Sequence, residues 1–120
     1  ADIAKNAQAW ADQQQGQMAH SSSQFRTLPG IGYCGENLAW GVTDAGAVKM
    51  WYDEIKYTDG GRVSSFDGQS GHYTQVVWKS SLKLGCGVYD KLLVCQYGPG
   101  GNFGGQFTNN VLPPVAGAQC

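Results

Sequence analysis

Two apolar runs separated by only two residues limit the possible folds more than any other feature of this sequence. They span 84–89 and 92–97, and both have a strand-like composition. A turn at Asp90 and Lys91 would join them into an antiparallel hairpin. Apolar side chains stand on both faces of this hairpin, so each face needs a covering layer. The sequence therefore predicts an α+β fold, a three-layer α-β-α sandwich with a central antiparallel sheet.

The register of this hairpin places Cys86 opposite Cys95. Counted back from the turn, they form a non-hydrogen-bonded pair, whose Cα atoms lie about 4.5 Å apart, within the range that a disulfide spans. Asp-Lys is not a favoured two-residue turn, so a longer loop or a bulge would shift the register. Two buried free thiols are the alternative to the bridge. A disulfide here would indicate an oxidising compartment.

The other two cysteines, Cys34 and Cys120, have no comparable geometric argument. Their partners stay open: each other, a segment outside this sequence, or another chain. The sequence begins Ala1-Asp2-Ile3, which is not a signal peptide, so we expect a mature or trimmed product or part of a longer protein.

Composition narrows the classes of partner. The chain has 120 residues, which fits one domain, and only 14% of them are charged. The net charge is −1 and no basic run occurs, which argues against nucleic acid and against strong attraction to anionic membranes. No apolar run approaches the ~20 residues that span a bilayer. We expect a polar, weakly charged surface with long loops.

Two amphipathic helices are predicted from apolar residues at helical spacing. The first lies near the N-terminus, with Gly16 marking its end. The second covers 44–57, with Asp44 as its N-cap. The residues that carry the two apolar stripes are Ile3, Ala7, Trp10 and Ala11 in the first helix, and Val48, Trp51 and Ile55 in the second.

The connecting segments are less regular. The serine-rich stretch 21–32 and the glycine-rich stretch 98–105 are predicted to be loops. The segment 35–40 is too short to classify by its period, and 71–78 is ambiguous, although we expect a short helix there.

The chain contains two histidines, His20 and His72, both in polar surroundings. Histidine is the side chain best suited to metal binding or proton transfer near neutral pH. Taken alone, however, a histidine is more often structural.

Two glutamates are further candidates. Glu54 follows Trp51 by three residues, so it lies at the edge of the buried stripe, where an unpaired carboxylate is costly. The simpler interpretation is a surface glutamate paired with Lys49 or Lys56. Glu36 is equally compatible with an exposed loop position.

Other chemistries have little support in the sequence. No G-x-S-x-G elbow occurs, and the glycine-rich run lacks the pattern of a phosphate-binding loop. A catalytic thiol would need a free cysteine with a low pKa, and the predicted bridge removes two of the four.

Four motifs, in order along the chain, resemble those of the CAP superfamily of cysteine-rich secretory proteins, venom antigens and plant pathogenesis-related class 1 proteins (the SCP-like extracellular domain). The two long signatures are Gly-His-Tyr-Thr-Gln-Val-Val-Trp at 71–78 and the segment 92–103. The shorter ones are Gly-Glu-Asn-Leu-Ala at 35–39 and His20-Ser21. The resemblance covers nearly the whole chain.

Within that family, segments 34–40, 51–56 and 110–114 are most similar to the Golgi-associated plant-pathogenesis-related type, which is membrane-associated. Cys86 and Cys95 instead resemble the bridged pair of secreted members, and we give this pair more weight. The resemblance thus implies an extracellular protein, with Golgi membrane association as the alternative. The family's first helix would precede Ala1, so residues 1–120 would form one CAP domain that is incomplete at its N-terminus.

The resemblance also implies that His20, Glu36, Glu54 and His72 converge in one cleft. His20 and His72 would bind Zn²⁺ or another divalent cation, leaving positions for water. The glutamates would hold the imidazoles or orient that water.

The leading hypothesis is a secreted binding module rather than an enzyme. It would have this metal-capable cleft, and its partners would be a lipid or sterol, a glycan or an extracellular protein. One alternative is a zinc-dependent hydrolase, a protease or esterase that uses Glu36 and Glu54, although no H-E-x-x-H motif is present. The other is a structural subunit of a larger extracellular assembly.

Overall fold

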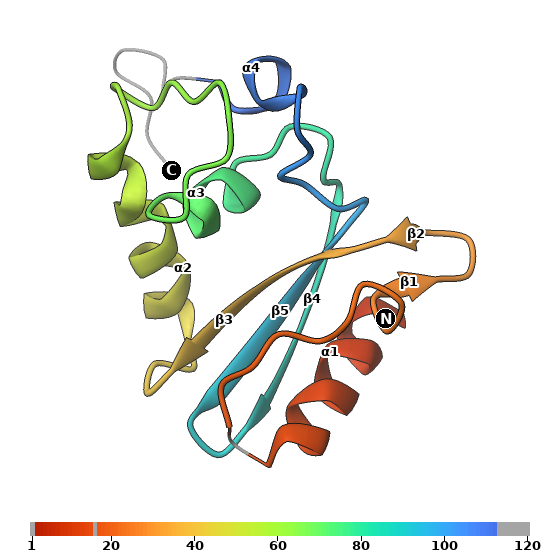
Figure 1. Cartoon of the computed structure of the whole chain (residues 1–120). Coiled ribbons are helices and arrows are strands. Elements are labelled where there is room, and N and C mark those ends of the chain that lie inside the picture. The colour runs from red at the N-terminus through yellow and green to blue at the C-terminus, as the bar shows by residue number, and fades with distance from the viewer. Residues whose placement is uncertain (1, 16, 113–120) are drawn as a thin grey trace.

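The computed structural model describes residues 2–15 and 17–112, and it has the predicted layers (Figure 1). A three-stranded antiparallel sheet lies between helix α1 (Asp2–Gln14) on one side and helices α2 (Ala45–Tyr52) and α3 (Gly71–Val76) on the other. The strands run in the order β3 (Gly35–Trp40), β5 (Leu92–Gly98), β4 (Lys83–Tyr89). The remaining elements are β1 (Thr27–Leu28), β2 (Gly32–Tyr33), the 3₁₀ helix η1 (Asp53–Tyr57) and α4 (Phe107–Asn110).

The β4–β5 hairpin has the register expected from its sequence. Cys86 lies opposite Cys95 with a Cα separation of 4.1 Å, and the two form a disulfide. Asp90 in the turn has a φ of 55°, a left-handed conformation that aspartate tolerates better than most residues. This conformation lets the chain reverse at a dipeptide that is otherwise unfavourable.

The prediction that both faces of the hairpin are covered is correct for β5 and wrong for β4. Every residue of β5 is buried, because α1 packs on one face and α2 on the other. On the α2 side, however, Leu84 and Val88 of β4 are 58% and 40% exposed. Since Ala47 and Trp51 of α2 pack against β3 and β5, this edge of the sheet stays open among the described residues.

Helix α1 packs unusually close to β4 because two strand positions lack a side chain. A Cβ atom on Gly87 would lie 2.4 Å from the Cα of Gln8, and one on Gly85 would lie 2.2 Å from the backbone nitrogen of Ala4. At this distance the Gln8 amide reaches the backbone of Val88, accepting from its N–H at 3.0 Å and donating to its carbonyl at 2.8 Å. These bonds occupy part of the exposed edge of β4.

The second predicted helix begins where expected, after Asp44, but it becomes a 3₁₀ helix after Tyr52. Asp44 caps α2 by accepting a hydrogen bond from the Gly46 N–H at 2.9 Å. Trp51 is buried, whereas Val48 is 39% exposed, contrary to the predicted stripe. After Tyr52 the chain tightens into η1, which carries Glu54.

The shorter segments also acquire definite structure. Residues 35–40 form the edge strand β3, and the expected short helix is α3. The stretch 21–32 is mostly loop, as predicted, but it contributes to the small β1–β2 hairpin. Gly16 lies outside the described residues.

Of the two remaining cysteines, Cys34 and Cys120, the structure describes only Cys34. Cys34 is a buried thiol without a disulfide in the described part of the chain, and burial raises its pKa. Cys120 lies outside the described residues, so the partners of Cys34 and Cys120 stay open.

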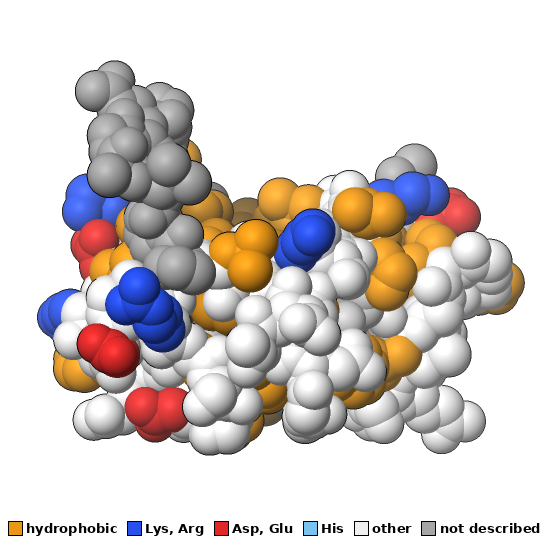
Figure 2. Space-filling view, turned by 90° about the horizontal axis from the view of Figure 1, so that it is seen from above, with side chains coloured by type: hydrophobic (Ala, Val, Ile, Leu, Met, Phe, Trp, Pro, Cys, Tyr) orange, Lys and Arg blue, Asp and Glu red, His pale blue; other side chains and the backbone are white. Residues whose placement is uncertain are grey.

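The surface matches the low charge of the composition. On the face shown in Figure 2, charged side chains are scattered among hydrophobic and uncharged polar atoms. Within residues 2–15 and 17–112, none of the helices is both long and apolar enough to span a bilayer.

Candidate functional site

His20 and Glu36 form the first of two histidine–glutamate pairs. His20 lies in the loop after α1, and its Nδ1 is 2.8 Å from Oε1 of Glu36 on β3. Ser21 donates to the same carboxylate from its backbone N–H at 2.9 Å and from its hydroxyl at 2.7 Å. Gln96 on β5 adds a bond of 3.0 Å to Oε2. A carboxylate with these donors holds the loop, and with it the imidazole, against the sheet.

The Glu36 side chain is fully buried, yet it favours the charged form. Burial by itself would raise the pKa of Glu36. Hydrogen bonds from His20, Gln96 and Ser21 outweigh that cost, so the pKa lies below its ordinary value of 4.5. Because an ionised carboxylate only accepts, Nδ1 of His20 carries the proton, and Nε2 is the nitrogen left for a ligand.

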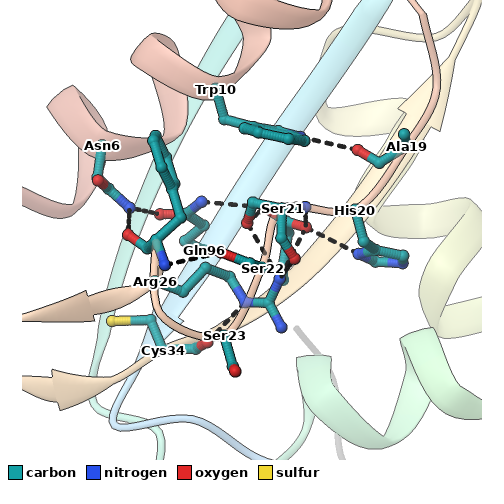
Figure 3. A network of polar contacts seen from close by, with 12 residues as sticks. Asn6, Trp10, Ala19, His20, Ser21, Ser22, Ser23, Arg26, Cys34 and Gln96 are labelled. Carbon is teal, nitrogen blue, oxygen red and sulfur yellow. Dashed lines mark hydrogen bonds and ion pairs between the residues drawn. The ribbon is translucent and has the colours of Figure 1, made fainter.

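Arg26 and Asn6 extend this network, shown in Figure 3, and neither was a candidate from the sequence. Nη1 of Arg26 lies 3.3 Å from Oε1 of Glu36, and the arginine side chain is only 11% exposed. Asn6 on α1 donates to the Gln96 Oε1 at 2.8 Å. Ser21 could be suspected only as part of the His-Ser motif. Nothing in the local sequence pattern points to Arg26, Asn6 or Gln96.

His72 and Glu54 form the second pair. Nδ1 of His72 lies 2.8 Å from Oε2 of Glu54, and the other carboxylate oxygen accepts from the backbone N–H groups of His72 and Tyr73 at 3.0 and 3.1 Å. The Trp51 ring stacks on the imidazole with centroids 6.1 Å apart. Glu54 is thus a partner of α3 rather than of a lysine.

The simpler interpretation of Glu54 as a lysine partner is therefore wrong. Lys49 pairs with Asp53 at 2.9 Å instead. The tight 3₁₀ geometry after Tyr52 leaves Asp53 on the exposed side and Glu54, with a side chain only 19% exposed, facing α3.

Both imidazoles line one hollow of about 240 Å³. Glu36 is part of its wall, whereas Glu54 contacts His72 without being among the lining residues. A second hollow, of about 420 Å³, shares His20, Glu36 and Asn102 with the first. Among the described residues, the first hollow is lined by His20, Glu36, Asn37, Phe66, Gly68, Gly71, His72 and Asn102.

The donor set offers a metal ion two imidazole nitrogens rather than a complete ligand group. The residues within 2–15 and 17–112 include no preassembled group of three or more His, Cys, Asp or Glu ligands. Two imidazoles with Nδ1 bound to carboxylates do remain, and such a carboxylate partner is the usual support of a zinc-ligating histidine. His20 and His72 would therefore supply two nitrogen ligands, and water or a partner molecule would supply the rest.

A separate, apolar hollow of about 610 Å³ lies between α2 and α3. Of the described residues that line it, Lys49 alone is charged, and Val48 is a lining residue that is 39% exposed. The other lining residues are Ala45, Tyr52, Val76 and Val77.

Comparison with known proteins gives a consistent result. The model of the cysteine-rich secretory protein family, CAP, matches residues 1–97. GLIPR1-like protein 1 of Bos taurus is 39% identical over 134 residues, covering 98% of this chain and 52% of that protein. The basic form of pathogenesis-related protein 1 of Nicotiana tabacum is 40% identical, covering 87% and 59%. The chain thus spans about half the length of the curated relatives it matches.

Solved structures agree with these sequence matches. The crystal structure of NaASP2 with Zn²⁺ superposes with a TM-score of 0.69 at 29% identity, covering 95% of this chain and 64% of that one.

Proposed function

The chain belongs to the CAP family of cysteine-rich secretory proteins, and we propose that it is an extracellular binding module that holds a divalent cation, Zn²⁺ first, between His20 and His72. One observation carries this proposal: two imidazoles line the same hollow, and each has its Nδ1 bound by its own glutamate at 2.8 Å. This arrangement leaves both Nε2 atoms for a ligand.

The chemistry of such a site would be that of an open coordination sphere. A zinc ion held by two protein nitrogens keeps positions for water and for one donor group of a partner. The glutamates would make the imidazoles better ligands by accepting from their N–H groups. The structure of NaASP2 with Zn²⁺ supports the choice of zinc as the first ion to test.

An extracellular location is part of the proposal. It is supported by the secretory family to which the chain belongs and by the Cys86–Cys95 disulfide. Disulfides persist in oxidising compartments and are rare in the cytosol. Non-reducing peptide mapping of the native protein should recover the Cys86–Cys95 pair, and a wholly reduced pair in that material would contradict the location.

Calorimetric titration with zinc tests the metal site directly. The wild type should bind one equivalent, and the double variant His20→Ala/His72→Ala should lose this binding, because it removes both nitrogen ligands. Circular dichroism of the variant controls for folding. Equal binding by the two proteins would exclude these histidines as the ligands.

The same contacts make a hydrolase the weaker alternative. A zinc hydrolase needs a carboxylate that is free to take a proton from water. Glu36 already accepts from His20, Ser21 and Gln96, while Glu54 accepts from two backbone N–H groups and from His72. Turnover of a peptide or ester by the zinc-loaded wild type, lost in Glu54→Gln, would restore this alternative.

Lipid or sterol binding is a second candidate function, favoured by the apolar hollow between α2 and α3. Its volume and lining suit a hydrocarbon ligand. A fluorescent sterol should bind the wild type, and Val77→Asp should weaken that binding by placing a charge in the hollow. Met18→Asp changes an apolar residue outside it and serves as the control. Equal loss in both variants would exclude this hollow as the site.

A further inference from the structure

The two imidazoles are held by different kinds of local structure. His72 belongs to α3, stacks on Trp51 and is 33% exposed. His20 lies in an irregular loop, outside any helix or strand, and is 56% exposed. The position of His20 therefore depends on the contacts of its carboxylate partner and of the next residue, Ser21.

Arg26 contacts both of these supports at once. Its Nη1 donates to the carbonyl and, at 3.0 Å, to the hydroxyl of Ser21, and it lies 3.3 Å from Oε1 of Glu36. Nε donates to the Cys34 carbonyl at 3.0 Å, and Nη2 donates to the Tyr33 hydroxyl at 3.1 Å. The guanidinium thus joins the His20 loop to the start of β3 (Figure 3).

The guanidinium also places a positive charge 3.3 Å from the buried carboxylate. Glu36 is fully buried and Arg26 is nearly so, which makes this a desolvated ion pair rather than a surface one. Among residues 2–15 and 17–112, no arginine or lysine pairs with Glu54, which is bound by backbone N–H groups and by His72. The two histidine–glutamate pairs are therefore built differently, and only the first includes an arginine.

We propose that Arg26 is the positioning residue of the metal site: through Ser21 and Glu36 it fixes the ring orientation of His20 without touching the ion. This inference rests on the proposed function for its metal readout. Lysine cannot replace the arginine, because one ammonium group cannot reach Cys34, Tyr33 and Ser21 together in the fork geometry of a guanidinium.

The test compares Arg26→Lys and Arg26→Met with the matched control Arg62→Met, which removes the other, exposed arginine of the chain. The first readout is ¹⁵N NMR of both imidazoles in the metal-free protein, which reports the tautomer of each ring. In the wild type and in Arg62→Met, His20 should be protonated at Nδ1 alone. In both Arg26 variants its signals should average between tautomers, while those of His72 stay unchanged.

The second readout is zinc affinity. Loss of a residue that supports a metal ligand typically costs 10–100-fold in affinity, so we expect roughly that loss in both Arg26 variants and none in Arg62→Met. Wild-type affinity and a fixed His20 tautomer in folded Arg26→Lys would overturn the inference. Collapse of the whole NMR spectrum in that variant would also overturn it, because it would show a general structural role.

The two readouts separate this inference from the proposed function. If the wild type binds no zinc while the Arg26 variants still release the His20 ring, the metal site is wrong and the positioning role stands. If zinc binds equally to all variants while the His20 ring is unaffected, the positioning role is wrong and the metal site stands.

Discussion

Glu36 shows how single residues decide the character of this site. Its carboxylate is contacted by a histidine, a serine and an arginine from the loop before β1, and by a glutamine from β5. Because so many donors converge on it, the charged form persists in a fully buried place. Glu36 therefore both connects the His20 loop to the sheet and lines the hollow.

This role gives a pH-dependent prediction. A carboxylate whose pKa is lowered on folding stabilises the protein above the unfolded-state pKa, and that stability is lost as the pH falls through the folded pKa. Below pH 4.5 the free energy of unfolding of the wild type should fall more steeply than that of Glu36→Gln. Urea denaturation between pH 7 and pH 3 measures both slopes, and parallel curves would contradict the prediction.

At pH 7, Glu36→Gln should lower the free energy of unfolding. Glu36→Gln leaves the guanidinium of Arg26 buried without its counter-charge, and breaking a buried pair in this way typically costs about 3–5 kcal/mol. The double variant Glu36→Gln/Arg26→Met removes both charges and should recover part of the loss. If the single variant is as stable as the wild type in urea, the ion pair contributes nothing.

The elements differ in how far their sequences determine them. The hairpin register and the cap at Asp44 follow from neighbouring residues, so both are predictable. The exposure of Val48 is not, because it depends on where α2 sits across the sheet. Likewise, Arg26 and Gln96 meet Glu36 from 10 and 60 residues away, and no local pattern records these contacts. The four-residue site itself came from resemblance rather than from spacing.

The close packing of α1 on β4 predicts the effect of adding a single methyl group. Gly87→Ala would place Cβ 2.4 Å from the Gln8 Cα, so the helix must move away from the strand. We expect a loss of about 1–3 kcal/mol, typical of overpacking. Gly104→Ala is the matched control, because a Cβ atom there meets nothing within 4 Å. Equal melting temperatures for the two variants would show that α1 does not pack as described.

For the whole molecule, we expect the disulfide to contribute to stability independently of zinc binding at the histidine site. The bridge closes a loop of nine residues, for which chain entropy predicts a stabilisation of about 2–3 kcal/mol. Cys86→Ala/Cys95→Ala should lose that amount in urea and yet bind zinc like the wild type, since neither cysteine lines the hollow. Loss of zinc binding in a folded variant would show that the two are coupled.

The two halves of the site belong to opposite layers of the sandwich. Gln96 and Asn6 connect Glu36 to α1, whereas His72 sits on α3 across the sheet. An ion bound by both imidazoles would link the two outer layers to each other around β3, the edge strand of the sheet. Its binding energy would then add to the folding energy, and the melting temperature would climb with the logarithm of zinc concentration once the ion exceeds its dissociation constant.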